Sequence, residues 1–552
     1  MSAWLSNAVF YQIYPQSFRD SNADGIGDLP GILEKLEYIQ KLGCNAIWIN
    51  PCFDSPFQDA GYDIADYYTV APRYGNNTDL RHIFQAVHRL GMHVILDLVP
   101  GHTSDRHPWF LESIQGPDNK FAKRYVWTDN RSQCFDLKRP GGDQSSNIRA
   151  YILGVGARDG LCAVNYYTCQ PCLNYGFEKI TDTYQSGTES PEAIATREAI
   201  MDVMRFWLRM GCDGFRVDMA GTLVKNDPEG QGNVRLWRHF RDFLDREFPE
   251  AVMISEWGRP ELSLLAGFHM DFLLHNGPSH YMDLSRTEHP FFSREDRGDV
   301  SEFVRTYEAN AALTAGKGLI CIPSGNHDMS RLAGMLDQEE MKIAFAFLLS
   351  MPGAPFLYYG DEIGMRWIDG LPSKEGSRSY RAGSRTPMQW ADDLNDGFSD
   401  ARPDRLYLPL DPTPAHPTAE AQMAAPNSLW QEVHRLIAPA AKLRGPAIRG
   451  PRYVPVRRAE PLPSGLRAYR QDRPGAGGLQ SRQGNPDLSP GPGGPGNGDL
   501  PPRPVGHPGT GPADRSRREY FLLLLRKLKI FPAGGPVSAG VFGKYFSNVL
   551  FQ

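Results

Sequence analysis

The sequence predicts an α/β fold: a (β/α)8 TIM barrel with a small domain inserted after the third strand and an incomplete or aberrant C-terminal β-domain. Apolar strand-like runs alternate with amphipathic helices along about four-fifths of the chain, which favours parallel pairing. Four of these runs lead into Asp, Glu or His, as expected where barrel strands open onto one catalytic face. At 552 residues the chain also exceeds a single ordinary core.

The predicted barrel elements follow one another in order. Strands are expected at 9–14, 45–50, 93–99, 215–219, 251–255, 271–275, 319–323 and 355–360. Helices are expected at 29–42, 78–90, up to residue 210, and at 233–248, 302–315, 341–350 and 427–443. Between these, periodicity stops from His102 to about Phe177, a segment too long for a simple loop. The predicted domains are therefore 1–103 (first part of the barrel), 104–176 (inserted domain), 177–445 (second part) and 446–552 (C-terminal domain).

Four strand ends carry the residues suited to chemistry. Those residues are His102 after 93–99, Arg216 and Asp218 within 215–219, Glu256 after 251–255, and His327 and Asp328 after 319–323. Arg216 and Asp218 are two apart, so on a strand they point to the same side. We expect Arg216 to depress the pKa of Asp218 and keep it ionised, as a carboxylate nucleophile must be. A structural ion pair is an equal alternative for this pair alone, but three acids from three strand ends favour one catalytic pocket.

These stretches, taken in order, resemble the motifs of the α-amylase superfamily, glycoside hydrolase family 13, over roughly the first four-fifths of the chain. Residues 170–175 and 384–390 are similar to stretches from its oligo-1,6-glucosidase, α-glucosidase and trehalose synthase side. The resemblance implies Asp218 as the nucleophile, Glu256 as the general acid/base and Asp328 as the transition-state stabiliser. It further implies substrate-binding roles for Tyr62, Asp63, His102, Arg216 and His327. From the residues alone, a packing Tyr, a solvated loop acid and structural histidines remain open alternatives.

Residues 20–28 form a loop with oxygen ligands at every second position. Asp20, Asn22, Asp24, the Ile26 carbonyl and Asp28 could together wrap a hard cation such as Ca²⁺. A polar turn in which Asp28 caps the next helix is the alternative. In the oligo-1,6-glucosidase-like members that the chain resembles, the same loop binds calcium, so we expect a structural Ca²⁺ here and no metal or cofactor in catalysis.

One position departs from the family pattern. Gly101 precedes His102, where the family usually has Asn. In amylases that Asn ligates a calcium ion between the barrel and the inserted domain. We therefore expect this second calcium to be missing.

Composition narrows the class of protein. The hydrophobic fraction of 41% is enough for a globular core. The formal net charge of −5 leaves no basic field that would favour binding to nucleic acid or an anionic membrane. Residues 1–7 lack the basic start of a signal peptide, and the eight cysteines are scattered, with Cys169 and Cys172 as the one close pair. We expect a reduced, cytoplasmic protein; the sequence does not address its oligomeric state.

The C-terminal part differs in composition from the rest. Pro and Gly dominate up to about residue 513, which predicts disorder because such a segment buries little apolar surface. Residues 520–531 are too short and too basic to span a bilayer. We hypothesise that the reading frame is altered after about Gln471.

Three functions are compatible with this pattern. The leading hypothesis is a retaining, exo-acting α-glucosidase that acts on a small oligosaccharide or α-glucoside. The alternative is glucosyl transfer or isomerisation, such as trehalose synthesis, in which a sugar replaces water as the acceptor. A non-catalytic binding relative is disfavoured because all three acids are present.

Overall fold

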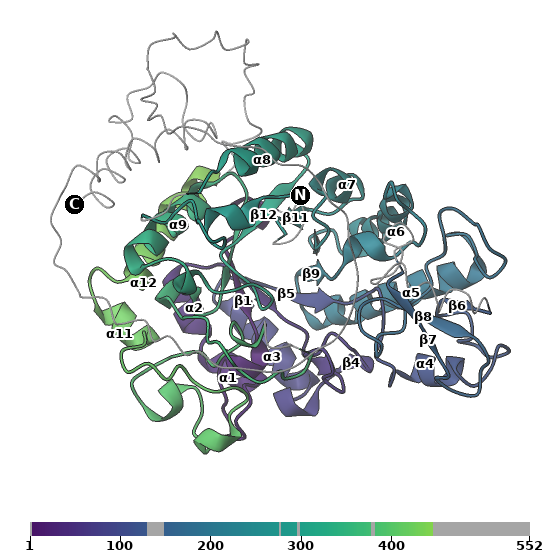
Figure 1. The fold of residues 1–552 in the computed structure, drawn as a ribbon, viewed down its shortest axis with the longest axis horizontal. Coiled ribbons are helices and arrows are strands. Elements are labelled where there is room, and N and C mark those ends of the chain that lie inside the picture. The colour runs from purple at the N-terminus through teal and green to yellow at the C-terminus, as the bar shows by residue number, and fades with distance from the viewer. Residues whose placement is uncertain (1–2, 130–147, 275–277, 295–297, 377–380, 445–552) are drawn as a thin grey trace, which may run out of the picture.

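The core of the computed structural model is a closed barrel of eight parallel strands (Figure 1). The structure describes residues 3–129, 148–274, 278–294, 298–376 and 381–444. Around the barrel the strands are β1 (Phe10–Ile13), β2 (Ala46–Ile49), β5 (His93–Leu98), β9 (Gly214–Val217), β10 (Val252–Ser255), β11 (Met270–Phe272), β12 (Leu319–Pro323) and β13 (Ala354–Tyr358). Each pairs in parallel with the next, and β13 returns to β1. The predicted (β/α)8 architecture is confirmed.

The barrel interior is a packed core and not a pore. Inward-facing residues of the strands form their own apolar cluster, separate from the larger cluster between strands and helices. Val252 and Ile254 belong to the inner cluster and Met253 to the outer one, as the two-residue period of a strand requires. Phe10 and Phe356, paired on the neighbouring strands β1 and β13, stack within this interior with ring centroids 4.2 Å apart. This apolar floor closes the barrel beneath the ends of the strands.

Helices cover the outside of the barrel, as Figure 1 shows. They are α1 (Leu29–Glu34), α2 (Leu36–Leu42), α3 (Asn77–Arg89), α5 (Pro191–Met210), α6 (Gln231–Glu247), α7 (Pro260–Leu265), α8 (Ser301–Thr314), α9 (Gln338–Ser350), α11 (Ala419–Ala424) and α12 (Leu429–Arg444). The single helix expected over 29–42 is two helices instead. They separate at Lys35, whose N–H bonds the Ile32 carbonyl, three residues back, and so tightens the turn.

In the sequence, a small antiparallel sheet is inserted after the third barrel strand and before the fourth; it lies at the right of Figure 1. Its strands are β6 (Trp127–Thr128), β8 (Leu161–Val164) and β7 (Ala150–Leu153), in that order, and α4 (Pro108–Ser113) precedes them. A bridge between His102 and Cys172 joins this segment to the end of β5. A second pair of strands, β3 (Phe53–Asp54) and β4 (Asp66–Val70), follows β2. Both additions rise beside the carboxyl ends of the barrel strands.

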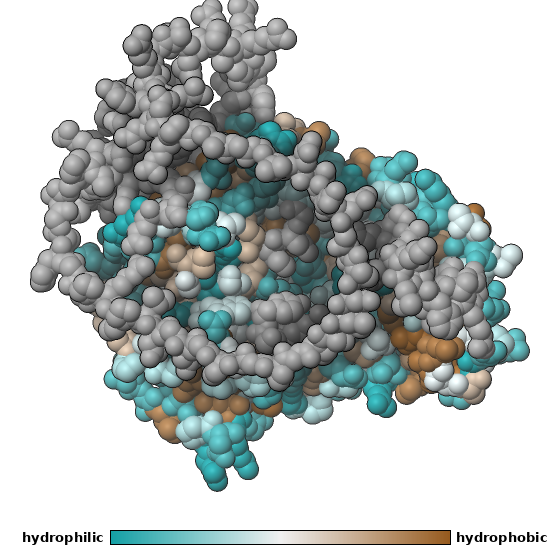
Figure 2. Space-filling model, in the orientation of Figure 1, coloured by the Kyte–Doolittle hydropathy of each residue, from teal (hydrophilic) through white to brown (hydrophobic). Residues whose placement is uncertain are grey.

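Two further observations complete the architecture. The predictions for 446–552, including the altered reading frame, lie outside the described residues. Within the described ranges, no helix is both long enough and apolar enough to cross a membrane. Figure 2 shows a mainly hydrophilic outer surface on the face toward the viewer, with separate apolar patches.

Candidate active site

The strand ends bring the predicted residues to one face of the barrel. Asp218 directly follows β9 and Glu256 directly follows β10, and their N–H groups continue the ladder by bonding the Leu98 and Val217 carbonyls, both at 2.9 Å. Asp328 lies five residues beyond the end of β12. The side chains of the three acids keep 11%, 24% and 25% of their surface exposed, so each can meet a solute.

Arg216 occupies the centre of this group. Its Nη1 lies 2.7 Å from Asp97 Oδ1 and 3.0 Å from Asp218 Oδ1, and its Nη2 lies 2.9 Å from Glu256 Oε2. Strand register explains the first contact, because Asp97 of β5 pairs directly with Arg216 of β9. The Arg216 side chain is only 4% exposed, so these charges interact in a largely water-free environment. One guanidinium therefore holds three carboxyl groups together.

Asp97 supports Arg216 from below. Its Oδ2 accepts hydrogen bonds from Trp48 Nε1 at 2.8 Å and from the Tyr62 hydroxyl at 3.2 Å. Burial raises the pKa of Asp97 to about 6, although Arg216 acts in the opposite direction. Because its side chain is fully buried, Asp97 orients Arg216 and does not reach a substrate.

The expected direction of the Asp218 pKa is wrong. Burial, and then the charge of Glu256, raise the pKa of Asp218 well above its ordinary value, and Arg216 only partly offsets them. The reason is that the single positive charge of Arg216 is shared among three carboxylates. Asp218 therefore binds a proton more readily than an isolated Asp.

Asp328 has the opposite surroundings. Arg381 Nη1 and Arg385 Nη2 donate to its Oδ1 at 2.8 and 2.7 Å. Burial works against the charged form, but the neighbouring positive charges hold the pKa of Asp328 well below its ordinary range. Sequence reasoning missed both arginines; Arg385 lies within the family-like stretch 384–390, whereas nothing around Arg381 marked it.

His327 is fixed as a neutral ring beside Asp328. Burial lowers its pKa to about 3. Its Nδ1 lies 3.1 Å from Gln12 Nε2 and 3.2 Å from Asn50 Nδ2. These amide nitrogens can only donate, so the ring proton is on Nε2. The Nε2 atom lies 3.5 Å from Asp328 Oδ2. Tyr62 stacks on the ring at a centroid distance of 5.4 Å, so the two predicted sugar-binding residues are in contact.

Asp63 lies close by but faces its own loop. Its carboxylate is fully buried and accepts hydrogen bonds from Ser55 Oγ, Gln58 N and Asp59 N at 2.8–3.0 Å. This arrangement suits a residue that shapes the loop, and its predicted role as a sugar ligand remains a prediction. Asp59, which sequence reasoning missed, interacts electrostatically with Arg381 and with Asp328, and burial raises its pKa to about 6.

The predicted calcium loop is compact. Asp28 caps α1 as expected, since its Oδ1 accepts from Gly31 N at 2.7 Å. Asp20 accepts from Asn22, Ala23 and Gly25 N–H groups and from Ser399 Oγ. No group of three His, Cys, Asp or Glu residues in the described ranges is assembled as a metal site. Asp20 and Asp28 are both almost fully buried, and their carboxylate oxygens are the ligand type that a hard cation takes, so calcium at this loop stays a prediction.

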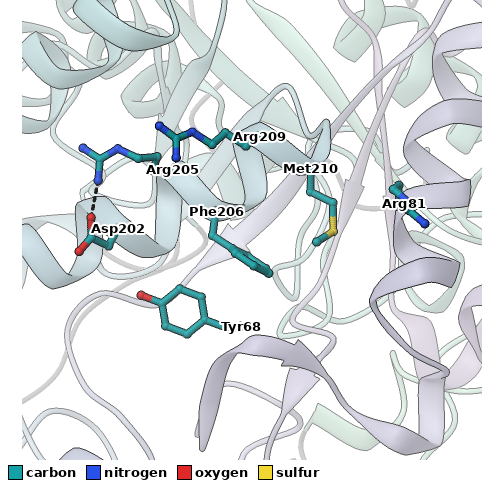
Figure 3. Close-up of a pocket in the computed structure, with 7 residues that line it drawn as sticks. All are labelled: Tyr68, Arg81, Asp202, Arg205, Phe206, Arg209 and Met210. Atoms are coloured by element: carbon teal, nitrogen blue, oxygen red, sulfur yellow. Dashed lines mark hydrogen bonds and ion pairs between the residues drawn. The ribbon is translucent and has the colours of Figure 1, made fainter.

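A surface pocket of about 530 Å³ lies away from this site, between α3 and α5 on the outside of the barrel. In Figure 3, Tyr68, Phe206 and Met210 lie between Arg81 on one side and the Asp202–Arg205 ion pair on the other. None of the predicted site residues lines it. This pocket is therefore separate from the carboxyl groups that surround Arg216.

Comparison with known proteins places this geometry in a family. Residues 12–444 match the model described as the alpha amylase catalytic domain. A trehalose synthase/amylase of Mycolicibacterium smegmatis is 33% identical over 489 residues, covering 79% of this chain and 76% of that protein. The oligo-1,6-glucosidase of Parageobacillus thermoglucosidasius is 29% identical over 509 residues, covering 79% and 83%.

Solved structures agree with this assignment. The trehalulose synthase of Pseudomonas mesoacidophila superposes with a TM-score of 0.66 at 25% identity, over 81% of this chain and 85% of that chain. The sequence motifs, the closed barrel and the clustered acids therefore lead to one conclusion. The chain belongs to the α-amylase family, glycoside hydrolase family 13, whose enzymes act on glycosidic bonds.

Proposed function

We propose that the protein is a retaining enzyme that cleaves terminal α-glucosidic bonds of short oligosaccharides or disaccharides through a covalent glucosyl–Asp218 intermediate. The observation that carries this proposal is the contact of Asp218 and Glu256 with the same guanidinium, that of Arg216. Such close carboxyl groups suit the retaining mechanism, which needs a separation of roughly 5 Å, better than the inverting one, which needs roughly 6.5–9.5 Å.

In the first step, the Asp218 carboxylate attacks the anomeric carbon and the glycosidic C–O bond breaks. Glu256 gives a proton to the leaving oxygen. In the second step, Glu256 takes a proton from the acceptor hydroxyl, which attacks the same carbon and frees Asp218. Asp328, kept ionised by Arg381 and Arg385, stabilises the positive charge that develops on the sugar ring in both steps.

Isomerisation is the second candidate function. The 33% identity to a trehalose synthase/amylase and the structural similarity to a trehalulose synthase support it. Both functions share the first step and differ in the acceptor, which is water for hydrolysis and the released sugar for isomerisation. We also propose that Asp20, Asn22, Asp24, the Ile26 carbonyl and Asp28 hold a structural Ca²⁺ that stabilises their loop.

Product analysis separates the two candidates. The purified protein is incubated with p-nitrophenyl α-glucoside, maltose, isomaltose, sucrose and trehalose, with Asp218→Asn as the control. Glucose as the main product, absent from the control, is the result expected for hydrolysis. Trehalose from maltose, or isomaltulose or trehalulose from sucrose, as main products would assign the isomerase function. Turnover that persists in the control would refute the nucleophile assignment.

A further inference from the structure

Asn165 connects the inserted segment to two catalytic loops. It directly follows β8 and is 3% exposed. Its Nδ2 lies 2.9 Å from His102 Nδ1, in the loop after β5. The same Nδ2 lies 3.8 Å from the Met219 sulfur, directly after the proposed nucleophile. One buried side-chain amide thus contacts residues that follow the third and fourth barrel strands.

Gly101 makes room for this amide. A Cβ atom added at position 101 would lie 2.7 Å from Asn165 Nδ2 and 3.5 Å from the Leu223 side chain. The first distance is shorter than a carbon–nitrogen contact allows, so any larger residue at 101 would displace Asn165. The family usually has its Asn at position 101 itself. This chain instead has glycine at 101 and a neighbouring amide supplied by Asn165 of the inserted segment.

The hydrogen bonds around His102 determine its tautomer. Its Nε2 lies 3.1 Å from the Tyr62 carbonyl oxygen, which can only accept, so Nε2 must carry the proton. Burial lowers the pKa of His102 to about 4, so the ring is neutral near pH 7 and its Nδ1 must accept. Asn165 must therefore present its NH₂ group, and not its oxygen, to Nδ1. The charge of Lys225, whose Nζ donates to the Thr222 carbonyl, also lowers the pKa of His102.

Met219 extends this connection to the general acid/base. Its backbone is left-handed, with φ 44° and ψ 42°, which is an uncommon conformation for a residue other than glycine. In this conformation its N–H donates to Glu256 Oε2 at 3.1 Å. Asn165 thus contacts the side chain of the residue whose backbone N–H holds the Glu256 carboxylate.

We propose that Asn165 is a positioning residue of this enzyme: together with the Tyr62 carbonyl, its amide holds His102 in the Nε2–H tautomer, it supports Met219, and Gly101 is the residue that admits it. The catalytic consequence rests on the proposed function. Loss of the amide frees the His102 ring, which holds the Tyr62 backbone, and loosens Met219 next to Asp218.

The test uses Asn165→Asp, an isosteric change that replaces the NH₂ donor by an acceptor. ¹⁵N NMR of imidazole nitrogens in the full-length protein reports the tautomer, and the His102 signals are identified by their loss in His102→Gln. We expect Nε2–H in the native protein, and a protonated Nδ1 in Asn165→Asp. Asn119→Asp, the same change in a loop of the inserted segment, should leave the His102 signals unchanged. Native-like His102 signals in a folded Asn165→Asp variant would overturn the proposal.

Activity gives an independent readout. Asn165→Asp should lower kcat/KM by about tenfold to hundredfold, as small displacements of catalytic groups do. Its pH profile should gain an ionisation that is absent from Asn165→Asp/His102→Gln, because a carboxylate beside His102 favours the imidazolium. A profile parallel to that of the native enzyme would contradict the inference. Since the tautomer is measured without turnover, failure of the proposed glucosidase function would not conceal the outcome.

Gly101→Ala tests the spatial part of the proposal. The added methyl group should displace Asn165 and produce the same His102 signals as Asn165→Leu, which lacks the amide. The double variant Gly101→Ala/Asn165→Ala removes the collision, so its melting temperature should exceed the value expected from adding the two single effects. Strict additivity would show that positions 101 and 165 do not share this space and would refute the proposed pairing.

Discussion

Replacing Asp271 by Asn should make the protein more stable at neutral pH, and this gain in stability should shrink as the pH falls. Asp271 lies in β11, is fully buried, and accepts hydrogen bonds from Ser255 Oγ at 2.7 Å, Trp257 N at 3.0 Å and Gly258 N at 3.3 Å, all on Oδ1. These donors flank Glu256 in the chain, so Asp271 shapes the turn that presents the proposed general acid/base.

The magnitude follows from the pKa of this buried group. Burial raises the pKa of Asp271 from 3.8 to about 7, against the hydrogen bonds that favour its charged form. The folded state therefore binds this proton more tightly than the unfolded state, and stability is lost as the pH rises from about 4 through about 7. At about 1.36 kcal/mol for each pH unit, the rise corresponds to about 4 kcal/mol. Asn cannot ionise and retains the Oδ1 acceptor, so the variant should lack this loss.

Urea unfolding at fixed temperature between pH 4 and pH 8 gives the free energy of unfolding of both proteins. The difference, variant minus native, should increase by up to about 4 kcal/mol across this range. The control Asp242→Asn changes an exposed carboxylate on α6 and should give a difference that is flat in pH. A flat difference for Asp271→Asn as well would refute the burial argument. Asp271→Ala, which removes the acceptor, should additionally lower kcat, because the turn that carries Glu256 loses its support.

Three further predictions concern the site and the loop. Glu256→Gln should lower kcat by about 10²–10⁴-fold on disaccharides and less on p-nitrophenyl α-glucoside, whose leaving group needs little protonation. Because burial and the charge of Glu256 raise the pKa of Asp218, kcat/KM of the native enzyme should fall with decreasing pH around a value above 3.8, which a pH–rate profile will measure. Asp59→Asn should lower kcat/KM with little change in melting temperature. Asp63→Ala should instead lower the melting temperature, because it removes three hydrogen bonds of about 1 kcal/mol each. The opposite pattern would favour Asp63 as the sugar ligand. EDTA should lower the melting temperature of the native protein, and added Ca²⁺ should restore it. Asp24→Ala should abolish this response. A native melting temperature that does not change with Ca²⁺ would contradict the proposed ion.

The barrel was predictable because its signals are local. Each buried strand reads as a short apolar run, and a parallel barrel places every strand end on the same face. The predicted strand over 319–323 matches β12, and most of the others differ by only one or two residues at their ends. The exception is the sixth strand, expected over 271–275: β11 ends at Phe272, although the Leu273 N–H still bonds the Cys321 carbonyl at 3.1 Å. The break at Lys35 was missed because the apolar stripe of 29–42 continues across it.

The loop residues were not predictable in the same way. Arg381 and Asp59 are far apart in the sequence and far from the strand that precedes Asp328. Both lie near Asp328 only because of how three loops fold over the barrel, and no periodic sequence pattern predicts that arrangement. Gly101 shows the same limit: the sequence revealed an absent Asn, but only the structure shows that Asn165 occupies the adjoining space.

The wrong direction for Asp218 shows what a pair of neighbours leaves out. Two residues apart in one strand, Arg216 and Asp218 suggest a simple ion pair, but Arg216 also contacts Asp97 and Glu256. At Asp328 the ratio is reversed, with two arginines on one carboxylate. Burial and excess negative charge raise the pKa of Asp218, whereas excess positive charge helps to hold the pKa of Asp328 low. The ratio of cations to carboxylates therefore distinguishes Asp218 from Asp328, in keeping with the different roles proposed for them, and that ratio exists only once the strands are assembled.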